Sequence, residues 1–154
     1  MKSGKLLEKP VVDVNTGISV GKITDVLLDG EQRLSRILVK LESGDIRFLP
    51  VESFEVGKES VLIKGVDCLK NAGGGDDHGM YQSCLGHLVI EENGREIGVV
   101  SNIIVPAAGE RIEGIEISGG LIKDLIDGRI QVPVDQIKTL EDQRLVITDQ
   151  GGID

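Results

Sequence analysis

The sequence predicts an all-β protein made of two tandem small β-barrels joined by a glycine-rich linker. Three observations lead to this expectation. The 154 residues are 40% apolar, with 21 glycines but only two Phe, one Tyr and no Trp, so Val, Ile and Leu must fill the core. Apolar residues alternate with polar ones in short runs between Gly, Asp, Asn and Pro, as in half-buried strands separated by turns. Finally, the chain repeats itself.

The repeat begins at a glycine-bearing turn. Placing Gly17 on Gly94, an offset of 94 − 17 = 77, aligns residues 15–21 with 92–98, and both segments contain the pattern G-x-x-(V/I)-G. The alternation after each turn continues for several residues and predicts a strand. Three later segments also correspond: 37–39 with 115–117, 48–54 with 131–137, and 61–63 with 145–147.

These correspondences set the expected domain boundaries. We expect a first barrel over 1–66, a linker over 67–83, a second barrel over 84–150 and a tail over 151–154. Each barrel should have five or six short strands, with a strand exit at Pro50 and at Pro133. Residues 119–130 are an insertion relative to the first barrel, and we expect a single helical turn there.

The segments V-V-D-V-N-T-G-I-S-V-G-K-I-T-D-V-L-L-D, R-I-L-V and F-L-P-V-E-S-F resemble the PRC-barrel domain family. The resemblance covers residues 5–65 and, less closely, 85–148. This domain occurs in the photosynthetic reaction-centre H subunit and in a small-subunit ribosome maturation factor. The resemblance implies a compact β-barrel with adaptor-like duties and no catalytic residues to transfer. The chain lacks the membrane helix of the first relative and the separate N-terminal domain of the second.

The charge of the chain lies in its second half. Residues 1–65 hold ten basic and ten acidic side chains, whereas residues 66–154 hold seven and sixteen, and 7 − 16 accounts for the whole net charge of −9. Nucleic-acid binding needs clustered basic residues and, for single strands, aromatic stacking faces, so direct binding of nucleic acid is disfavoured. We expect a protein partner, basic in character, to meet Glu110, Glu113 and Glu116. An acidic surface that only maintains solubility is the alternative.

No stretch of the sequence predicts a membrane span or a signal peptide. The longest apolar runs are far shorter than the roughly 20 residues that cross a bilayer, and Lys9 and Pro10 interrupt the only candidate leader. We therefore expect a cytoplasmic protein.

The joining segment contains all the cysteines and histidines of the chain: Cys68, His78, Cys84 and His87. Two thiolates and two imidazoles would complete a tetrahedral zinc site. Their spacing matches no compact zinc finger, however, and a glycine run lies between them. The alternative hypothesis places Cys68 at the end of the first barrel and Cys84 with His87 at the start of the second, with no metal or other cofactor.

No catalytic residues are predicted. Gly17–Lys22 has three residues between its glycines instead of the four of a phosphate-binding loop, and a strand follows. We expect a non-enzymatic protein-binding or adaptor module, with ribosome maturation or RNA processing as the process that the resemblance suggests. The alternatives are a peripheral component of a membrane or electron-transfer complex, and a sensor ordered by metal. The sequence leaves the oligomeric state open.

Overall fold

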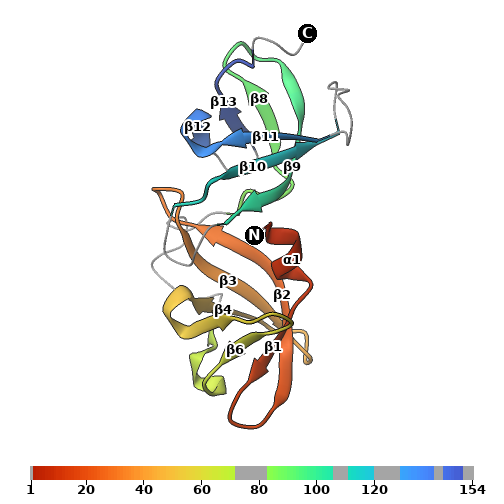
Figure 1. Cartoon of the computed structure of the whole chain (residues 1–154), viewed down its shortest axis with the longest axis vertical. Coiled ribbons are helices and arrows are strands. Elements are labelled where there is room, and N and C mark those ends of the chain that lie inside the picture. The colour runs from red at the N-terminus through yellow and green to blue at the C-terminus, as the bar shows by residue number, and fades with distance from the viewer. Residues whose placement is uncertain (1, 72–82, 106–110, 120–128, 141–143, 151–154) are drawn as a thin grey trace.

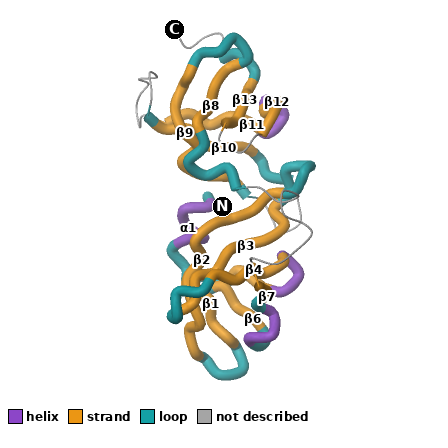
Figure 2. The backbone as a smooth tube through the Cα atoms, turned by 180° about the vertical axis from the view of Figure 1, so that it is seen from behind, coloured by secondary structure: helices purple, strands orange, loops and turns teal. Residues whose placement is uncertain are grey.

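The computed structural model describes residues 2–71, 83–105, 111–119, 129–140 and 144–150. Two strand-rich units follow each other along the long axis, and the N-terminus lies where they meet (Figure 1). The view from behind shows that nearly all of the regular structure is strand, with a short helix and three single 3₁₀ turns (Figure 2).

The first unit is a seven-stranded sheet in the order β5-β6-β1-β2-β3-β4-β7. Its strands are β1 (Pro10–Asp13), β2 (Ile18–Leu28), β3 (Leu34–Leu41), β4 (Ile46–Pro50), β5 (Phe54–Val56), β6 (Val61–Ile63) and β7 (Lys70–Asn71). The helix α1 (Ser3–Leu7) precedes β1, and the turns η1 (Val51–Ser53) and η2 (Val66–Cys68) follow β4 and β6.

The second unit is a six-stranded sheet in the order β11-β10-β9-β8-β13-β12. Its strands are β8 (Leu88–Glu91), β9 (Glu96–Ile104), β10 (Gly114–Ser118), β11 (Arg129–Pro133), β12 (Ile137–Leu140) and β13 (Arg144–Ile147), with η3 (Val134–Gln136) after β11.

The two sheets have the same topology, which confirms the predicted tandem barrels. Apart from the short β7, which extends the first sheet beyond β4, the strands correspond: β1 pairs antiparallel with β2 and parallel with β6, as β8 pairs antiparallel with β9 and parallel with β13. Val11 pairs with Gly21 and with Val61, and Val89 pairs with Gly98 and with Leu145. The predicted strand exits are also confirmed, because Pro50 ends β4 and Pro133 ends β11, each directly before a 3₁₀ turn.

The repeated glycines allow a close approach between strands. A Cβ on Gly21 would lie 2.5 Å from the carbonyl oxygen of Lys40, and a Cβ on Gly98 would lie 2.6 Å from that of Ser118. Real Cβ atoms do not approach a carbonyl oxygen this closely, so any side chain would push the second strand off the third. The G-x-x-(V/I)-G pattern therefore ends in a glycine for steric reasons.

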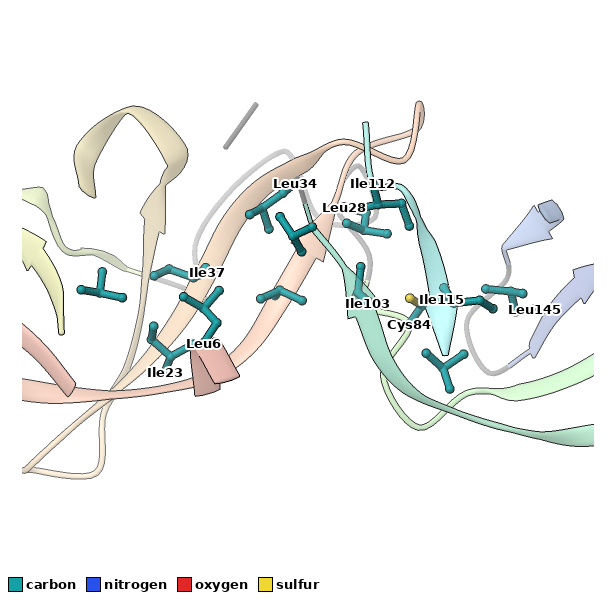
Figure 3. Packing of buried hydrophobic residues seen from close by; sticks show 14 of the residues in the cluster. Leu6, Ile23, Leu28, Leu34, Ile37, Cys84, Ile103, Ile112, Ile115 and Leu145 are labelled. Carbon is teal, nitrogen blue, oxygen red and sulfur yellow. The ribbon is translucent and has the colours of Figure 1, made fainter. Parts of the chain in front are cut away.

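The cores of the two barrels form one continuous cluster of buried Val, Ile and Leu side chains. Leu28 and Leu34, at the end of the β2–β3 hairpin, lie beside Ile103 and Ile112 of the second barrel (Figure 3). Each barrel alone has a small core, and the shared cluster adds apolar burial at the junction.

Three features differ from or fall outside the expectation. The helix α1 was not predicted, because five residues are too few to give a helical period. The first sheet continues to Asn71, past the boundary expected at residue 66, since β7 pairs with β4. The expected helical turn falls largely on residues 120–128, which lie outside the described residues. No helix in the described ranges is long and apolar enough to cross a membrane.

Candidate binding site

The barrels meet along a seam that we define by α1, the β2–β3 hairpin, residues 83–87 and the β9–β10 pair. Arg33 and Arg111 form an antiparallel bridge across the seam, and the N–H of Ile112 donates to the carbonyl of Gln32 at 2.8 Å. The two arginines are equivalent positions of the repeat, because Arg33 precedes β3 as Arg111 precedes β10. A contact between equivalent residues is the mark of an isologous, two-fold interface, here within one chain.

On one side of the seam, α1 contacts β9. The backbone N–H of Gly4 donates to Oδ1 of Asn102 at 2.8 Å, and the N–H of Ile103 donates to Oγ of the buried Ser3 at 2.9 Å. A Cβ on Gly4 would lie 2.7 Å from the same Asn102 oxygen, so a side chain at this position would displace the Asn102 amide.

Asn102 also connects to a charged pair. Its Nδ2 donates to Oε1 of Glu116 at 2.9 Å, and Nζ of Lys2 lies 2.8 Å from Oε2 of the same carboxylate. Burial by itself would raise the pKa of Glu116. The hydrogen bonds from Lys2 and Asn102, the charge of Lys2 and a hydrogen bond from Gln131 outweigh it and hold that pKa below its usual value.

On the other side of the seam, the segment that leads into the second barrel contacts β2. The carboxyl group of Asp25 interacts with Ser83, with its neighbour Val26 and with the charge of His87. Burial dominates these effects and raises the pKa of Asp25 above its usual value. Asp25 and Asn102 are equivalent in the repeat, since they pair with Leu38 and with Glu116. The segment that precedes the first strand of each barrel thus contacts the equivalent residue of the other barrel: α1 contacts Asn102, and residues 83–87 contact Asp25.

One of the predicted partner-binding residues, Glu116, lies in the seam. Glu116 is buried, with a relative exposure of 2%, so the expectation that it belongs to an exposed acidic surface is wrong. It lies on β10, where the repeat has Leu38, and its charge is used within the chain. Glu113 is exposed. Glu110 lies outside the described residues.

The structure does not bring the predicted metal ligands together. Cys68 lies in η2 of the first barrel, and Cys84 is buried in the core of the second. Cys84 precedes Val89 by five residues as the buried Leu6 precedes Val11, so it takes the place of a core leucine. Within the described residues, no group of three or more His, Cys, Asp or Glu could hold a metal ion. His78 lies outside them.

The side chains of Cys84 and His87 at the seam are poorly suited to nucleophilic chemistry. Burial, with a contribution from the charge of Asp25, raises the pKa of the Cys84 thiol to about 12. The Nε2 atom of His87 is buried and has no hydrogen-bond partner among the described residues. A thiol of such high pKa is almost wholly protonated at neutral pH and is inert.

A surface pocket lies in the first barrel, away from the seam. It has a volume of about 300 Å³ and is lined by Val14, Glu52, Ser53, Phe54, Glu55, Leu62, Ile63, Lys64 and Cys68. Its walls come from the end of β1, from η1 with β5, and from the end of β6 with η2. Apolar side chains supply much of the lining, and the charged residues are exposed. The pocket is at the small end of the range for ligand sites.

The course of the chain after β6 leaves this pocket open. Gly65 has φ 105° and ψ 149°, a conformation that only glycine adopts readily, and it turns the chain into η2. Val66 then projects into solvent with a relative exposure of 54%.

In the second barrel a side chain that follows β13 lies at the corresponding place. After β13 the side chain of Gln150 donates from Nε2 to Oε1 of Gln136 at 2.8 Å and to the carbonyl of Thr148 at 3.0 Å. The N–H of Gln150 donates to Oε2 of the buried Glu91. Gln136 and Thr148 are the equivalents of Ser53 and Lys64, which line the pocket. Gln150 thus bridges, in the second barrel, the equivalents of two residues that line the pocket of the first.

Sequence reasoning missed this site, although a signal was present in the repeat. The N–H of Val14 donates to the carbonyl of Ile63 as that of Glu92 donates to Ile147, so Val14 takes the place of Glu92, one residue off the turn alignment because the first turn is one residue longer. Val14 is 48% exposed. Where the second has Gln150, the first has Val66 after a glycine. Apolar residues replace polar ones at exposed positions of the same fold, and such a replacement indicates a surface that is covered by something else.

The fold and these sites define the class of protein as a tandem β-barrel whose halves associate through an internal two-fold seam. The family model for the PRC-barrel domain matches residues 1–67 and 81–152, one copy in each half. The chain therefore belongs to the PRC-barrel domain family, as two tandem copies. Comparison with curated proteins gave no match.

Proposed function

We propose that this chain is a non-enzymatic, cytoplasmic protein-binding module whose first barrel holds the partner at the open pocket. The observation that carries the proposal is the internal comparison: in the second barrel Gln150 bridges Gln136 and Thr148, whereas in the first barrel their equivalents line an open pocket that is rich in apolar residues.

Exposed apolar residues around the pocket support this choice. Val14 lines it with 48% of its surface exposed, and Val66, two residues before Cys68, is 54% exposed. Burying such side chains against a partner gives roughly 25 cal/mol for each Å² of apolar surface removed from water. Single exposed valines are common, but two of them beside a pocket favour a binding surface.

The pocket offers little for catalysis. Its hydroxyl and thiol groups are those of Ser53 and Cys68, and Sγ of Cys68 lies 4.0 Å from the carbonyl oxygen of Lys64, its hydrogen-bond acceptor. Among the described residues no histidine lines the pocket, and a nucleophilic thiol or hydroxyl is normally activated by such a base. Binding therefore fits the pocket better than bond cleavage.

The acidic surface of the second barrel stays a competing location for the partner. Of the three acidic residues in that hypothesis, Glu113 is the one that the structure describes as exposed. By resemblance to the ribosome maturation factor, we place the partner among proteins of ribosome assembly or RNA processing. A peripheral role in a membrane complex is the second candidate, by resemblance to the H subunit.

The test is co-purification of the tagged full chain from its native cells at mild salt, with mass spectrometry. We expect V14E and V66E to lose the partner. V99E is the matched control, because Val99 is 40% exposed on β9 of the second barrel and distant in the fold from η2.

E113K is the competing variant. Loss of the partner in E113K with retention in V14E and V66E would move the site to the second barrel and overturn the proposal. Recovery of membrane complexes in place of ribosomal or RNA-processing proteins would favour the second candidate.

A further inference from the structure

The pocket lies beside an unpaired sheet edge. The strand β5 is the edge of the first sheet and pairs with β6 alone in the described structure. The N–H of Gly57 donates to the carbonyl of Ser60 at 2.8 Å, so that pair is a hydrogen-bonded one. Hydrogen-bonded and non-hydrogen-bonded pairs alternate along an antiparallel ladder. The N–H and C=O groups of Phe54 and Val56 therefore point away from β6, toward the free edge.

The pocket and this edge share residues. Phe54 and Glu55 of β5 line the pocket, and Leu62 and Cys68 lie across from them. A cavity of about 300 Å³ is too small for a folded surface but takes one side chain of a segment that runs along the strand. In the second barrel, a single side chain from the segment after β13, that of Gln150, bonds to the equivalents of Ser53 and Lys64.

The charges around the pocket indicate which residues should flank the partner side chain that enters it. Glu52 and Glu55 are exposed beside the pocket, against the single cation of Lys64. The lining therefore has a net charge of −1 by this count, 1 − 2. Alternate residues of a strand point to the same side, so a residue two positions from the pocket side chain faces the same surface.

We propose that the pocket and the β5 edge together bind an extended segment of a partner protein, which adds to the sheet as a strand. One apolar side chain of the segment enters the pocket, and a basic side chain two residues away pairs with Glu52 or Glu55. Main-chain hydrogen bonds supply affinity in such strand addition, and the pocket supplies specificity. This inference rests on the proposed function and names the kind of partner segment.

The test is an NMR titration of the ¹⁵N-labelled full chain with a capped model peptide, acetyl-Thr-Leu-Thr-Arg-Thr-amide. We expect chemical-shift changes at the amides of Phe54, Val56 and Cys68, with weak binding that declines as salt is raised. The matched peptides replace Leu with Ala or Arg with Glu, and each should weaken binding at least fivefold.

The variant V56P separates strand addition from simple pocket filling. Its proline removes one outward N–H group at an edge strand, where proline is tolerated, and leaves the pocket lining unchanged. We expect V56P to lose the peptide while its other amide resonances stay dispersed. Equal binding by V56P, or equal binding of the Glu peptide, would overturn the inference.

The two proposals fail in different ways. If the peptide causes no shifts at β5 while V14E and V66E still lose the cellular partner, the pocket binds a protein but not an extended basic segment. If the peptide binds as expected while both variants keep the cellular partner, the proposed function fails at this site.

Discussion

Nζ of Lys2 lies 2.8 Å from Oε2 of Glu116, and this ion pair joins the start of the first barrel to β10 of the second. The carboxylate side chain is 3% exposed, whereas the lysine side chain is 42% exposed. A carboxylate in that position depends on its partners, because an unpaired buried charge is strongly destabilising.

We predict that E116Q lowers the free energy of unfolding by about 1.5–3 kcal/mol at neutral pH, the range for a hydrogen bond to a charged group. Glutamine keeps an acceptor for Asn102 but loses the pairing with Lys2. Urea unfolding of the full chain measures the change. A matched surface variant, E113Q, should leave the stability within about 0.5 kcal/mol of the original chain.

The same pair predicts a pH dependence. The pKa of Glu116 is lowered in the folded chain, so its contribution is complete above the unfolded value of 4.5 and is lost as the pH falls through the folded value. The stability gap between the original chain and E116Q should therefore close on acidification below about pH 4.5. A gap that stays constant down to pH 3 would show that Glu116 is not ionised in the seam.

The pH dependence expected from Asp25 is opposite in sign to that expected from Glu116. Its pKa is raised in the folded chain, chiefly by burial, so its contribution is complete below the unfolded value of 3.8 and is lost as the pH rises through the folded value. At neutral pH the ionised carboxylate thus weakens the fold. We predict that D25N, which copies the Asn102 of the other barrel, raises Tm by on the order of 2 °C at pH 7.

Calorimetry at pH 7 and pH 4 checks this prediction, because the gain should shrink at the lower pH. D67N serves as the control, since Asp67 is exposed in η2 and should show no such dependence. A lower Tm for D25N at pH 7 would mean that the interactions with Ser83 and His87 outweigh the cost of burial.

The repeated glycines give a steric prediction. In G21A the new Cβ would lie 2.5 Å from the carbonyl of Lys40, and we expect a loss of about 1–3 kcal/mol, as for other overpacked sites. Gly30 is the matched control, because a Cβ there meets no atom within 4 Å. Equal stability of G21A and G30A in urea unfolding would contradict the close approach of β2 and β3.

The barrels could be predicted from the sequence because the turns, strands and strand exits are local features that short segments encode. The repeat contains each of these signals twice, as with Gly21 and Pro50 in the first barrel. The seam depends on contacts across the whole chain. Gly4 and Asn102, 98 residues apart, are joined by a hydrogen bond that no sequence periodicity predicts. The sequence alone predicted Glu116 to be a surface charge. Its burial is possible because Lys2, which is distant in sequence, and Asn102 pair with its carboxylate. The pocket arises from the turn at Gly65, whose effect appears only when both barrels are compared in space.

The two cysteines should differ sharply in reactivity. Cys84 is fully buried and its thiol has a pKa of about 12, so at pH 8 roughly one part in ten thousand would be thiolate even if reagent reached it. Cys68 lies half-buried in the pocket of the first barrel. We predict that iodoacetamide modifies one thiol per native chain, that this thiol is Cys68, and that C68S abolishes the reaction.

Mass spectrometry of the intact chain measures the modification, and both thiols should react once the chain is unfolded in urea. The model peptide of the further inference should slow the labelling of Cys68 in the native chain, because it fills the pocket. Rapid native labelling of Cys84 in C68S would contradict the closed core. It would also show that the seam between the barrels opens on the timescale of the reaction, since Cys84 lies where residues 83–87 contact β2.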